Sequence, residues 1–562
     1  EEIKEVPTEL DVIVQEINHL HQQEGIAAVA QPWLPPLKER ITLDELEKVV
    51  PIEAWQKRTA PSVLIGVADI PQAQKQEAVA IDLSKDGNIL LYGSPGTGKT
   101  TFLQTAAMDL ARKQSPENLT MYLLDFGTNG LAPLTQLPHV ADSLLLDQTE
   151  KIQKFIRIIN RELDRRKKLL SEHGVGTIAL YREVTGKQEP TMVILMDSYE
   201  SMKDEPYETD LFKLFMRISR EGLSIGVHLI ITASRQNNLR AQLYSNFKHQ
   251  LTLPQNDISE VRGIVGATPL ASTMEDIKGR ALMKRDEVDV VQFALPVAGD
   301  NDIQIINNLR DQVQSLKEMW TGRTPAGIPM VPDELTEAAF YGREDVKESM
   351  ENLEFPIGLD FEMVKTIKIP FDRLKNLVFM ADSPESLENQ QKHLLNTALQ
   401  FGSKLHIMLV DPLEECIAYK DRVSTYISSS QEISEIAKQL IYEVDRRLEK
   451  DLYSDWLIMM PTIKAIVDHG LTEKDLRYLF DNGPRVGMHF VIGSEYAYLG
   501  NNINEVPKYL KGNAQWFMIG MRLMDQMFLD KPYNNREARL ASDEIYLHDR
   551  KQAIKLKITK NG

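Results

Sequence analysis

Short runs of consecutive apolar residues alternate along the chain with longer stretches in which apolar residues recur every three or four positions. The runs include "ILLY" from Ile89, "MVILM" from Met192 and "HLIIT" from His228, and the amphipathic stretch "TFLQTAAMDLARK" follows the first of them. Unbroken apolar runs are typical of strands buried on both faces, and the longer stretches predict helices. Strands that alternate with helices favour a mostly parallel sheet covered by helices, so the predicted fold class is α/β.

The same series of elements occurs twice along the chain. The clearest pairs are "NILLYGSPGTGK" from Asn88 with "NLVFMADSPES" from Asn376, "MYLLDFG" from Met121 with "HIMLVDPL" from His406, and "IGVHLIITAS" from Ile225 with "VGMHFVIGS" from Val486. Several matches in one order indicate a duplicated architecture, and the period is too long for a solenoid. We therefore predict a Pro-containing, extended lead-in over residues 1–60, one module over 61–325 and a second module over 326–562.

The turn after the first apolar run of the first module matches the phosphate loop G-x-x-x-x-G-K-[ST]. Glycines let successive backbone N–H groups face one anion, and the dipole of the following helix adds to the attraction. ATP is the expected ligand, with Lys99 reaching its β- and γ-phosphates. The predicted nucleotide-binding residues are Gly93, Ser94, Pro95, Gly96, Thr97, Gly98, Lys99, Thr100 and Thr101. The alternative is a glycine-rich turn between strand and helix that has no function.

An acid at the end of a buried strand completes such a site, and Asp197 ends "TMVILMD". We expect Asp197 and the Thr100 hydroxyl to hold Mg²⁺; the alternative for Asp197 is a simple cap of the strand end. Ser198 follows, where many ATPases of this type have a glutamate that orients the attacking water, and a serine cannot act as a carboxylate. Glu200 lies close in sequence, but its direction from the strand cannot be read. The residues therefore support ATP binding more than fast hydrolysis.

Arginines and a threonine are further candidates for the chemistry. "IITASR" places Thr232 and Arg235 at the tip of a neighbouring strand, either to sense the γ-phosphate or as an ordinary polar cluster. Arg165 and Arg166 lie on a charged helix, and either one is a candidate arginine finger for a neighbouring module, although a solvated helix face is the simpler interpretation. The predicted catalytic residues are Lys99, Asp197 and Arg235.

Composition narrows the functional classes. The chain has 562 residues and a net charge of −17, which disfavours a dedicated nucleic-acid binder because such binding neutralises phosphates with basic residues. The single cysteine, Cys416, excludes an intrachain disulfide and a cysteine-rich metal site, as expected in a reducing cytoplasm. No apolar run approaches the roughly 18 residues of a membrane span. The start, "EEIKEVPTEL", lacks a signal-peptide pattern, and we expect a fragment whose membrane anchor lies outside this sequence.

The motifs together resemble a known family. "DFGTNGLAPLTQLPHV" from Asp125, the phosphate loop, "ILMDS", "GVHLIITASR" and "KGRALMK" from Lys278 resemble the FtsK/SpoIIIE-type ATPases, and among them the ATPases of type VII secretion systems (EssC/EccC). The resemblance covers nearly the whole chain, which is similar to the second and third of three ATPase modules in series. It implies tandem RecA-like folds, ATP with Mg²⁺, export of small WXG100-type proteins, other membrane components as partners, and a homo-oligomer such as a hexamer. It also implies the cytoplasmic part of a cell-membrane protein.

The second module departs from this pattern. No glycine or lysine lies between Ser383 and Gln391, and Pro461 aligns with Asp197. We therefore expect a weak ATPase in the first module and a second module that binds no nucleotide. The family resemblance implies that this last module meets the substrate, so we expect it to take the C-terminal tail of a substrate in an apolar groove; the alternative is a decayed module kept for packing. Two other functions stay open for the whole chain, a DNA translocase and a regulatory scaffold that binds nucleotide with little turnover.

Overall fold

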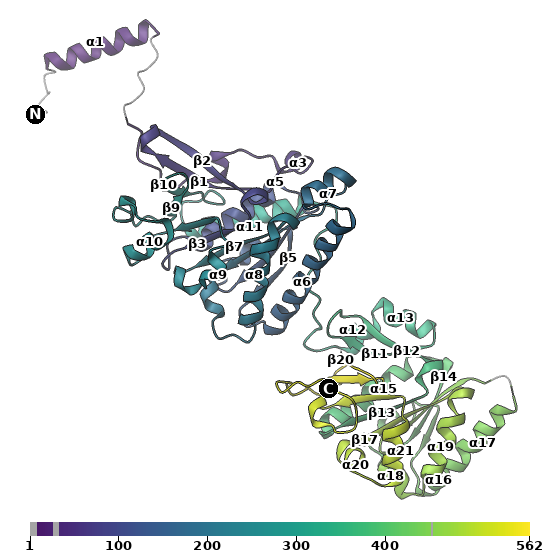
Figure 1. The fold of residues 1–562 in the computed structure, drawn as a ribbon. Coiled ribbons are helices and arrows are strands. Elements are labelled where there is room, and N and C mark those ends of the chain that lie inside the picture. The colour runs from purple at the N-terminus through teal and green to yellow at the C-terminus, as the bar shows by residue number, and fades with distance from the viewer. Residues whose placement is uncertain (1–7, 26–32, 451–452, 562) are drawn as a thin grey trace, which may run out of the picture. The chain divides into compact units, whose positions relative to one another are not determined.

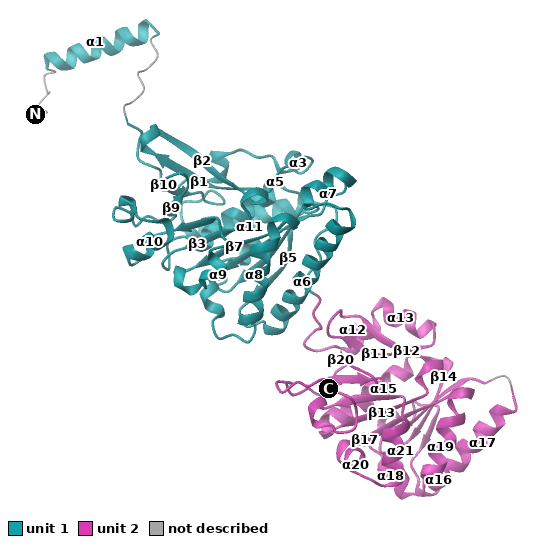
Figure 2. Cartoon of the chain, viewed as in Figure 1, with its two compact units in different colours: residues 1–328 teal, residues 329–562 magenta. Residues whose placement is uncertain are grey.

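The computed structural model describes residues 8–25, 33–450 and 453–561. The chain divides into two compact units, Glu1–Ile328 and Pro329–Gly562, called here the first unit and the second unit (Figure 2). The boundary predicted from the sequence, at residue 326, lies a few residues earlier.

The first unit is built on one ten-stranded sheet with helices around it (Figure 1). Its strands are β1 (Ser62–Ile70), β2 (Lys75–Asp82), β3 (Ile89–Tyr92), β4 (Leu119–Asp125), β5 (Val140–Leu145), β6 (Thr191–Asp197), β7 (Val227–Ala233), β8 (His249–Thr252), β9 (Arg280–Lys284) and β10 (Val288–Phe293). The strand order is β2-β1-β10-β9-β8-β3-β7-β6-β4-β5. The strands from β8 to β5 in this order are parallel, whereas β2, β1, β10 and β9 extend the sheet in antiparallel pairs.

The second unit repeats this sheet strand for strand. Its strands are β11 (Glu354–Asp360), β12 (Thr366–Pro370), β13 (Asn376–Ala381), β14 (Leu405–Val410), β15 (Thr425–Ile427), β16 (Asp455–Met460), β17 (Met488–Glu495), β18 (Trp516–Gly520), β19 (Glu544–His548) and β20 (Ala553–Lys557). The order β12-β11-β20-β19-β18-β13-β17-β16-β14-β15 is that of the first unit, with each strand replaced by its counterpart. The predicted α/β class with central, mostly parallel sheets is confirmed; the antiparallel edge of each sheet was not predicted.

Helices cover the sheet of each unit. In the first unit these are α2 (Leu43–Leu46), α3 (Pro51–Ala54), α4 (Leu83–Asp86), α5 (Lys99–Lys113), α6 (Thr149–Glu172), α7 (Ile178–Thr185), α8 (Glu208–Ile225), α9 (Ala241–Tyr244), α10 (Ile258–Val265) and α11 (Asp302–Met319); α1 (Glu9–Gln23), which has no buried residue, precedes them. Those of the second unit are α12 (Glu337–Tyr341), α13 (Glu344–Glu351), α14 (Phe371–Leu374), α15 (Pro384–Leu399), α16 (Ser430–Ser434), α17 (Ile436–Leu448), α18 (Ile463–Asp468), α19 (Glu473–Asn482), α20 (Tyr496–Gly500) and α21 (Glu505–Asn513). Within the described part of the chain, none of them combines the length and the apolarity needed to cross a membrane.

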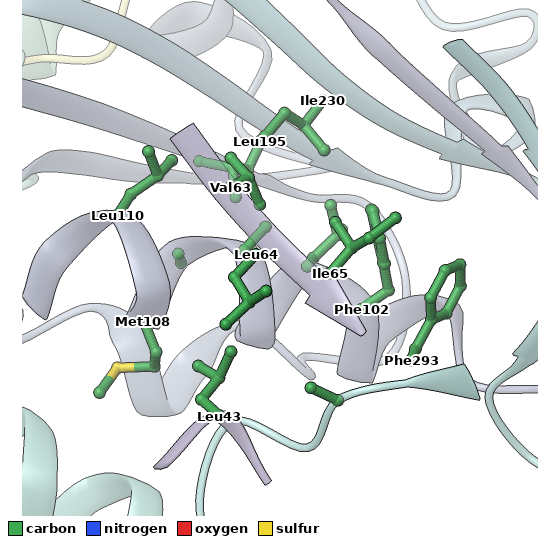
Figure 3. Packing of buried hydrophobic residues seen from close by; sticks show 14 of the residues in the cluster. Leu43, Val63, Leu64, Ile65, Phe102, Met108, Leu110, Leu195, Ile230 and Phe293 are labelled. Atoms are coloured by element: carbon green, nitrogen blue, oxygen red, sulfur yellow. The ribbon is translucent and has the colours of Figure 1, made fainter. Parts of the chain in front are cut away.

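Part of the predicted lead-in belongs to the core of the first unit. Figure 3 shows Leu43 packed near Val63–Ile65 of β1 and the side chains of α5. Trp55 is buried in the same cluster, and its Nε1 donates a hydrogen bond to the Ala111 carbonyl of α5 at 2.8 Å. Where the structure describes it, the lead-in is thus not a plain extended linker: it contains α1, α2 and α3, and its last part packs against the sheet because its apolar residues find partners there.

Candidate nucleotide-binding site

The phosphate loop lies where the predicted strand and helix meet, between the end of β3 and the start of α5. Gly96 and Gly98 have φ angles of +79° and +114°, which residues with a Cβ rarely adopt. A Cβ on Gly93 would lie 2.7 Å from Thr97 Oγ1 and 2.8 Å from Leu253 Cβ. The loop therefore needs glycine for its shape. A loop of this shape lets backbone N–H groups face an anion at the N-terminus of α5.

Neighbouring strands hold the phosphate loop in place. Gly93 N donates to Ala233 O at 3.1 Å, and Ser94 N donates to Pro254 O at 3.0 Å, so the loop is tied to the ends of β7 and β8. Thr97 O accepts from Gly279 N at 2.9 Å. Gly279 belongs to the "KGRALMK" segment, which the sequence analysis quoted without giving it a role. The segment supports the loop from the antiparallel side of the sheet.

Lys99 lies over the phosphate loop. Its Nζ donates to Gly93 O at 2.6 Å and to Ser94 O at 3.0 Å. An ammonium group has three N–H donors, so a third is left for an anion in the loop. Burial lowers the pKa of Lys99, and the charges of Glu200 and Asp197 oppose this effect. The lysine is thus placed to meet a phosphate from inside the loop.

A hydroxyl and a carboxylate meet beside the loop at the predicted metal site. Thr100 Oγ1 donates to Asp197 Oδ2 at 2.7 Å, and Thr232 Oγ1 donates to Asp197 Oδ1 at 2.7 Å. Asp197 is almost fully buried at the end of β6. Oxygen ligands of this kind fit Mg²⁺, so Thr100 and Asp197 would hold the ion. Bound there, Mg²⁺ would neutralise charge on the phosphate oxygens of the nucleotide.

The loop after β4 closes this edge of the sheet. Asp125 Oδ2 accepts a hydrogen bond from Leu131 N at 3.1 Å, and burial raises the pKa of Asp125, with the nearby Asp197 adding to the rise. A Cβ on Gly127 would lie 3.0 Å from Asp197 Oδ2, and one on Gly130 would lie 2.2 Å from Thr100 Cγ2. The Asp-Phe-Gly stretch therefore packs directly on the metal-site residues, a role that the sequence analysis did not give it.

Glu200 is the main site residue whose position the sequence could not give. Ser234 Oγ donates to Glu200 Oε1 at 2.5 Å, and Ser234 N donates to Glu200 Oε2 at 3.2 Å. Ser234 directly follows β7, whose last residue binds the phosphate loop. A second carboxylate therefore lies at this edge of the sheet, although Ser198 is not an acid.

The structure places the predicted arginines in different surroundings. Arg235 is half exposed, and its Nε lies 3.5 Å from Glu260 Oε1, so its side chain is directed to α10. The structure thus brings Lys99, Thr100 and Asp197 together, but not Arg235. Arg166 is 1% exposed and donates to Ile225 O at 2.8 Å and Pro190 O at 2.7 Å, with Glu162 as its ion partner. A side chain buried in this way is neither a solvated helix face nor a finger for another subunit.

Arg165 keeps the exposed position expected of a charged helix face. It pairs with Glu162 and with Glu189, and about half of its side chain is exposed. The interpretation of the charged helix is therefore right for Arg165 and wrong for Arg166. The 3.6-residue period of the helix explains the difference, because neighbouring residues point about 100° apart.

The same edge of the second unit lacks the phosphate site. Between β13 and α15 stand only Asp382 and Ser383, against residues 93–98 between β3 and α5. Met196 pairs with Ile231 and Met460 pairs with Ile492, which puts Pro461 at the position of Asp197. In the same way Leu91 pairs with Thr232, whereas Phe379 pairs with Gly493. The shorter turn has no room for a glycine cradle.

A groove of about 600 Å³ lies at this edge of the second unit, called here the strand-end groove. Its apolar lining includes Leu387, Leu413, Ile463 and Tyr498, and its charged lining consists of Glu388, Glu415, Asp468, Glu495 and Lys464. Burial raises the pKa of Glu415, and the charges of Asp411, Glu495 and Glu388 add to the rise. The groove is thus apolar in part and clearly acidic; its acidic side chains were not part of the expectation from the sequence.

The chain is similar in sequence to a known family model and to several known proteins. The model of the FtsK/SpoIIIE family matches residues 52–271. The type VII secretion system protein EssC of Staphylococcus aureus (strain MSSA476) is 32% identical over 550 residues, which cover 97% of this chain and 37% of that protein. The ESX secretion system protein YukB of Bacillus subtilis (strain 168) is 27% identical over 573 residues, which cover 99% of this chain and 37% of that protein. The chain therefore spans well under half the length of these relatives.

Solved structures of similar fold cover both units. EssC (ATPases 2 and 3) from Geobacillus thermodenitrificans matches with a TM-score of 0.82 and 24% identity, over 94% of this chain and all of that one. Thermomonospora curvata EccC (ATPases 2 and 3), solved in complex with a signal sequence peptide, matches with a TM-score of 0.61 and 20% identity, over 94% of this chain and 100% of that one. The predicted fold, two tandem RecA-like ATPase domains, is confirmed.

Proposed function

We propose that this chain, whose residues 52–271 match the FtsK/SpoIIIE family model, forms two ATPase-type modules of a type VII secretion motor. In this proposal the first unit binds ATP with Mg²⁺, and the second unit binds exported proteins of the WXG100 type. The homologues named EssC and YukB support the secretion role. The whole motor would include membrane components and several copies of this chain, with the two units on its cytoplasmic side.

One observation carries the nucleotide part of the proposal. Lys99, the glycine loop, Thr100 and Asp197 converge at the N-terminus of α5, with Thr100 Oγ1 2.7 Å from Asp197 Oδ2. The loop N–H groups and the helix dipole favour a polyphosphate, and Lys99 adds a positive charge. The residues are thus suited to hold a nucleoside triphosphate by its phosphates.

Slow turnover by the isolated chain is part of the proposal. An arginine supplied by a neighbouring subunit is worth about 10³–10⁵ in the rate of phosphoryl transfer. Arg166 is buried in the first unit and Arg235 is directed to Glu260, so a dilute chain would lack that contribution. Hydrolysis would accelerate when copies assemble. Turnover of many ATP per second by a dilute monomer would contradict this part.

The strand-end groove supports the part that concerns the second unit. Leu387, Leu413 and Ile463 offer apolar surface to a short helix or an extended tail, and the surrounding carboxylates favour a tail with a basic side chain. The structure of T. curvata EccC contains a signal sequence peptide, and we extend that kind of ligand to this chain. The C-terminal tail of a WXG100-type protein is the occupant we propose.

Two titrations of the intact chain test the proposal. A fluorescent ATP analogue with Mg²⁺ should bind the native chain and the control Lys392→Ala, which changes a surface lysine of α15, but not Lys99→Ala. Peptides from the C-termini of candidate substrates should bind the native chain by calorimetry, and Leu413→Asp should weaken them. Analogue binding that persists in Lys99→Ala refutes the first part, and no binding of any cognate peptide refutes the second.

A further inference from the structure

We infer that Glu200, which stands three residues after Asp197, supplies the carboxylate that takes the proton of the water attacking ATP, and that Ser234 holds it back in the resting chain. The inference rests on the proposed binding of ATP by the first unit. It assigns to the site a carboxylate, which the serine at position 198 cannot supply.

The backbone after β6 brings Glu200 to the phosphate site. Ser198 has a φ of +61°, in the left-handed region that residues other than glycine rarely adopt. Ser198 N donates to Thr232 Oγ1 at 3.0 Å, and the buried side chains of Tyr199 and Met202 anchor the 3₁₀ turn Tyr199–Met202 that follows. The left-handed residue therefore turns the chain back toward the end of β7. Strain of this kind, fixed by its surroundings, is common at functional sites.

The position of Ser234 puts Glu200 next to the phosphate loop. Ser234 binds both carboxylate oxygens of Glu200, and the preceding residue, Ala233, accepts the N–H of Gly93. Burial lowers the pKa of Lys99, and the negative charges of Glu200 and Asp197 oppose this change. The effect of Glu200 is the larger of the two. Two carboxylates thus face the Lys99 ammonium, and only Asp197 is used by the predicted metal site.

The contacts of Glu200 with Ser234 describe a restrained base. Two hydrogen bonds to Ser234 fix both oxygens of the carboxylate in place. They hold the carboxylate at the end of β7, beside the phosphate loop. Release from Ser234 would free the Glu200 carboxylate to turn toward the water.

In the second unit, Glu200 and Ser234 are both replaced, which supports a joint role for these two residues. With Pro461 at the position of Asp197, the position of Glu200 is taken by Lys464, which pairs with Asp468 on α18 at 3.8 Å. The residue at the position of Ser234 is Glu495. The unit without a phosphate loop therefore lacks both the acid and the serine that holds it.

The chemical step balances without a further reactant. The water oxygen forms a bond to the γ-phosphorus while the bond from that phosphorus to the β–γ bridging oxygen breaks. The bridging oxygen leaves with the electron pair as part of ADP, and Glu200 accepts the proton of the water. The products are ADP and inorganic phosphate, and the carboxylic acid then returns its proton to solvent.

A single-turnover experiment on the intact chain tests the inference. Excess protein is mixed with ATP and Mg²⁺, then denatured at intervals, and the ratio of ATP to ADP is measured; analogue affinity is measured in parallel. A general base contributes about 10²–10⁴ in rate, so Glu200→Gln should slow hydrolysis by about 100-fold or more while analogue affinity changes less than about twofold. The nearby Glu205→Gln serves as the control and should behave as the native chain.

The serine gives the second arm. Ser234→Ala should speed hydrolysis above the native rate, and Ser234→Ala with Glu200→Gln should lose that gain. Native rates in Glu200→Gln would overturn the inference, as would a gain that survives in the double variant. Complete absence of hydrolysis in both the native chain and Ser234→Ala, with ATP bound, would overturn it too. Failure of the native chain to bind the analogue would instead refute the proposed function.

Discussion

The two units have the same sheet but different strand ends. Each strand of the first sheet has a counterpart in the second, in the same order, while the turn before α15 is much shorter than the phosphate loop. The conserved part of the design is thus the framework of buried strands. The part that changed is the crevice at the carboxyl ends of the parallel strands, where ligands bind in open α/β sheets. A fold of this type can lose one binding site while its sheet and helices remain.

A pair of buried arginines shows how closely the frameworks correspond. Arg447 of α17 donates to Ser454 O at 2.7 Å and to Val486 O at 2.9 Å, and it pairs with Glu443 at 2.9 Å. Arg166 of α6 makes the corresponding contacts with Pro190 O, Ile225 O and Glu162. The second unit keeps this arginine although it lacks the phosphate site. The shared role is therefore structural: the guanidinium ties a helix to the strand loops beside it.

The lost site was filled rather than left open. At the position of Thr232 the second unit has Gly493, and a Cβ there would lie 2.4 Å from the Phe379 ring and 2.3 Å from Pro461 O. Phe379 stands where the first unit has Leu91. The larger ring uses the space that a threonine side chain would take, so the second unit is closely packed at this point.

The largest effects should come from the paired arginines. Arg166→Ala and Arg447→Ala each remove a buried guanidinium from two carbonyl oxygens, while Glu162 and Glu443 keep their second partners Arg165 and Arg446. A buried acceptor left without a donor costs about 1–3 kcal/mol, so two cost about 2–6 kcal/mol. Each variant should lower the stability of its own unit by that order, measured by denaturant unfolding. Their exposed neighbours Arg165→Ala and Arg446→Ala are matched controls and should cost less than about 1 kcal/mol. An Arg166→Ala chain of full stability that hydrolyses ATP slowly in the assembled state would restore the finger interpretation.

A smaller loss should follow from giving the second unit a residue of the first. Gly493→Thr would force its side chain against the Phe379 ring, and overpacking of this kind costs about 1–3 kcal/mol. Adding Phe379→Leu, which restores the first unit's pair at both positions, should recover part of the loss. The free energy of unfolding of the second unit measures both. A Gly493→Thr chain as stable as the native one would show that this point is not closely packed.

The smallest effect concerns pH. Burial lowers the pKa of His139 and His228 in the first unit, and of His393 in the second, to about 4 each. Below about pH 6.5 the unfolded chain binds protons at these positions while the folded chain does not until about pH 4, so stability falls as the pH falls through this window.

The loss should be about 1 kcal/mol for each of these three histidines between pH 7 and 5.5, and so larger in the first unit, which has two of them. His406 of the second unit, whose pKa burial lowers to a lesser extent, adds a smaller loss there. Thermal unfolding at the two pH values measures it, with ATP used to identify the transition of the first unit. The exposed His19→Gln should leave the difference unchanged. Equal acid destabilisation of both units would contradict this reading of the buried histidines.

The repeat and the place of the glycine loop between strand and helix were predictable because their signals are local. Unbroken apolar runs identify buried strands, and the glycines and lysine of the phosphate loop have a fixed spacing that the backbone geometry demands. Asp197 was predictable for the same reason, since it ends such a run. The antiparallel strands at the edge of each sheet were not, because nothing local in "RALMK" or "VDVVQF" gives their neighbours.

The positions of Glu200 and Arg166 could not be predicted because each depends on distant residues. Glu200 reaches the site only through the left-handed Ser198, whose conformation is fixed by Thr232 on another strand. Arg166 looks like any charged residue of an amphipathic helix until the carbonyls of Pro190 and Ile225 surround it. A pattern of polar and apolar residues does not record such long-range hydrogen bonds.

The number of ATP molecules bound per chain tests the central claim most directly. That claim is that the first unit keeps a phosphate site that the second has lost. Isothermal titration of the intact chain with a non-hydrolysable ATP analogue and Mg²⁺ should give one site per chain, and Lys99→Ala should give none. A stoichiometry of two, or a single site that survives in Lys99→Ala, would contradict the account.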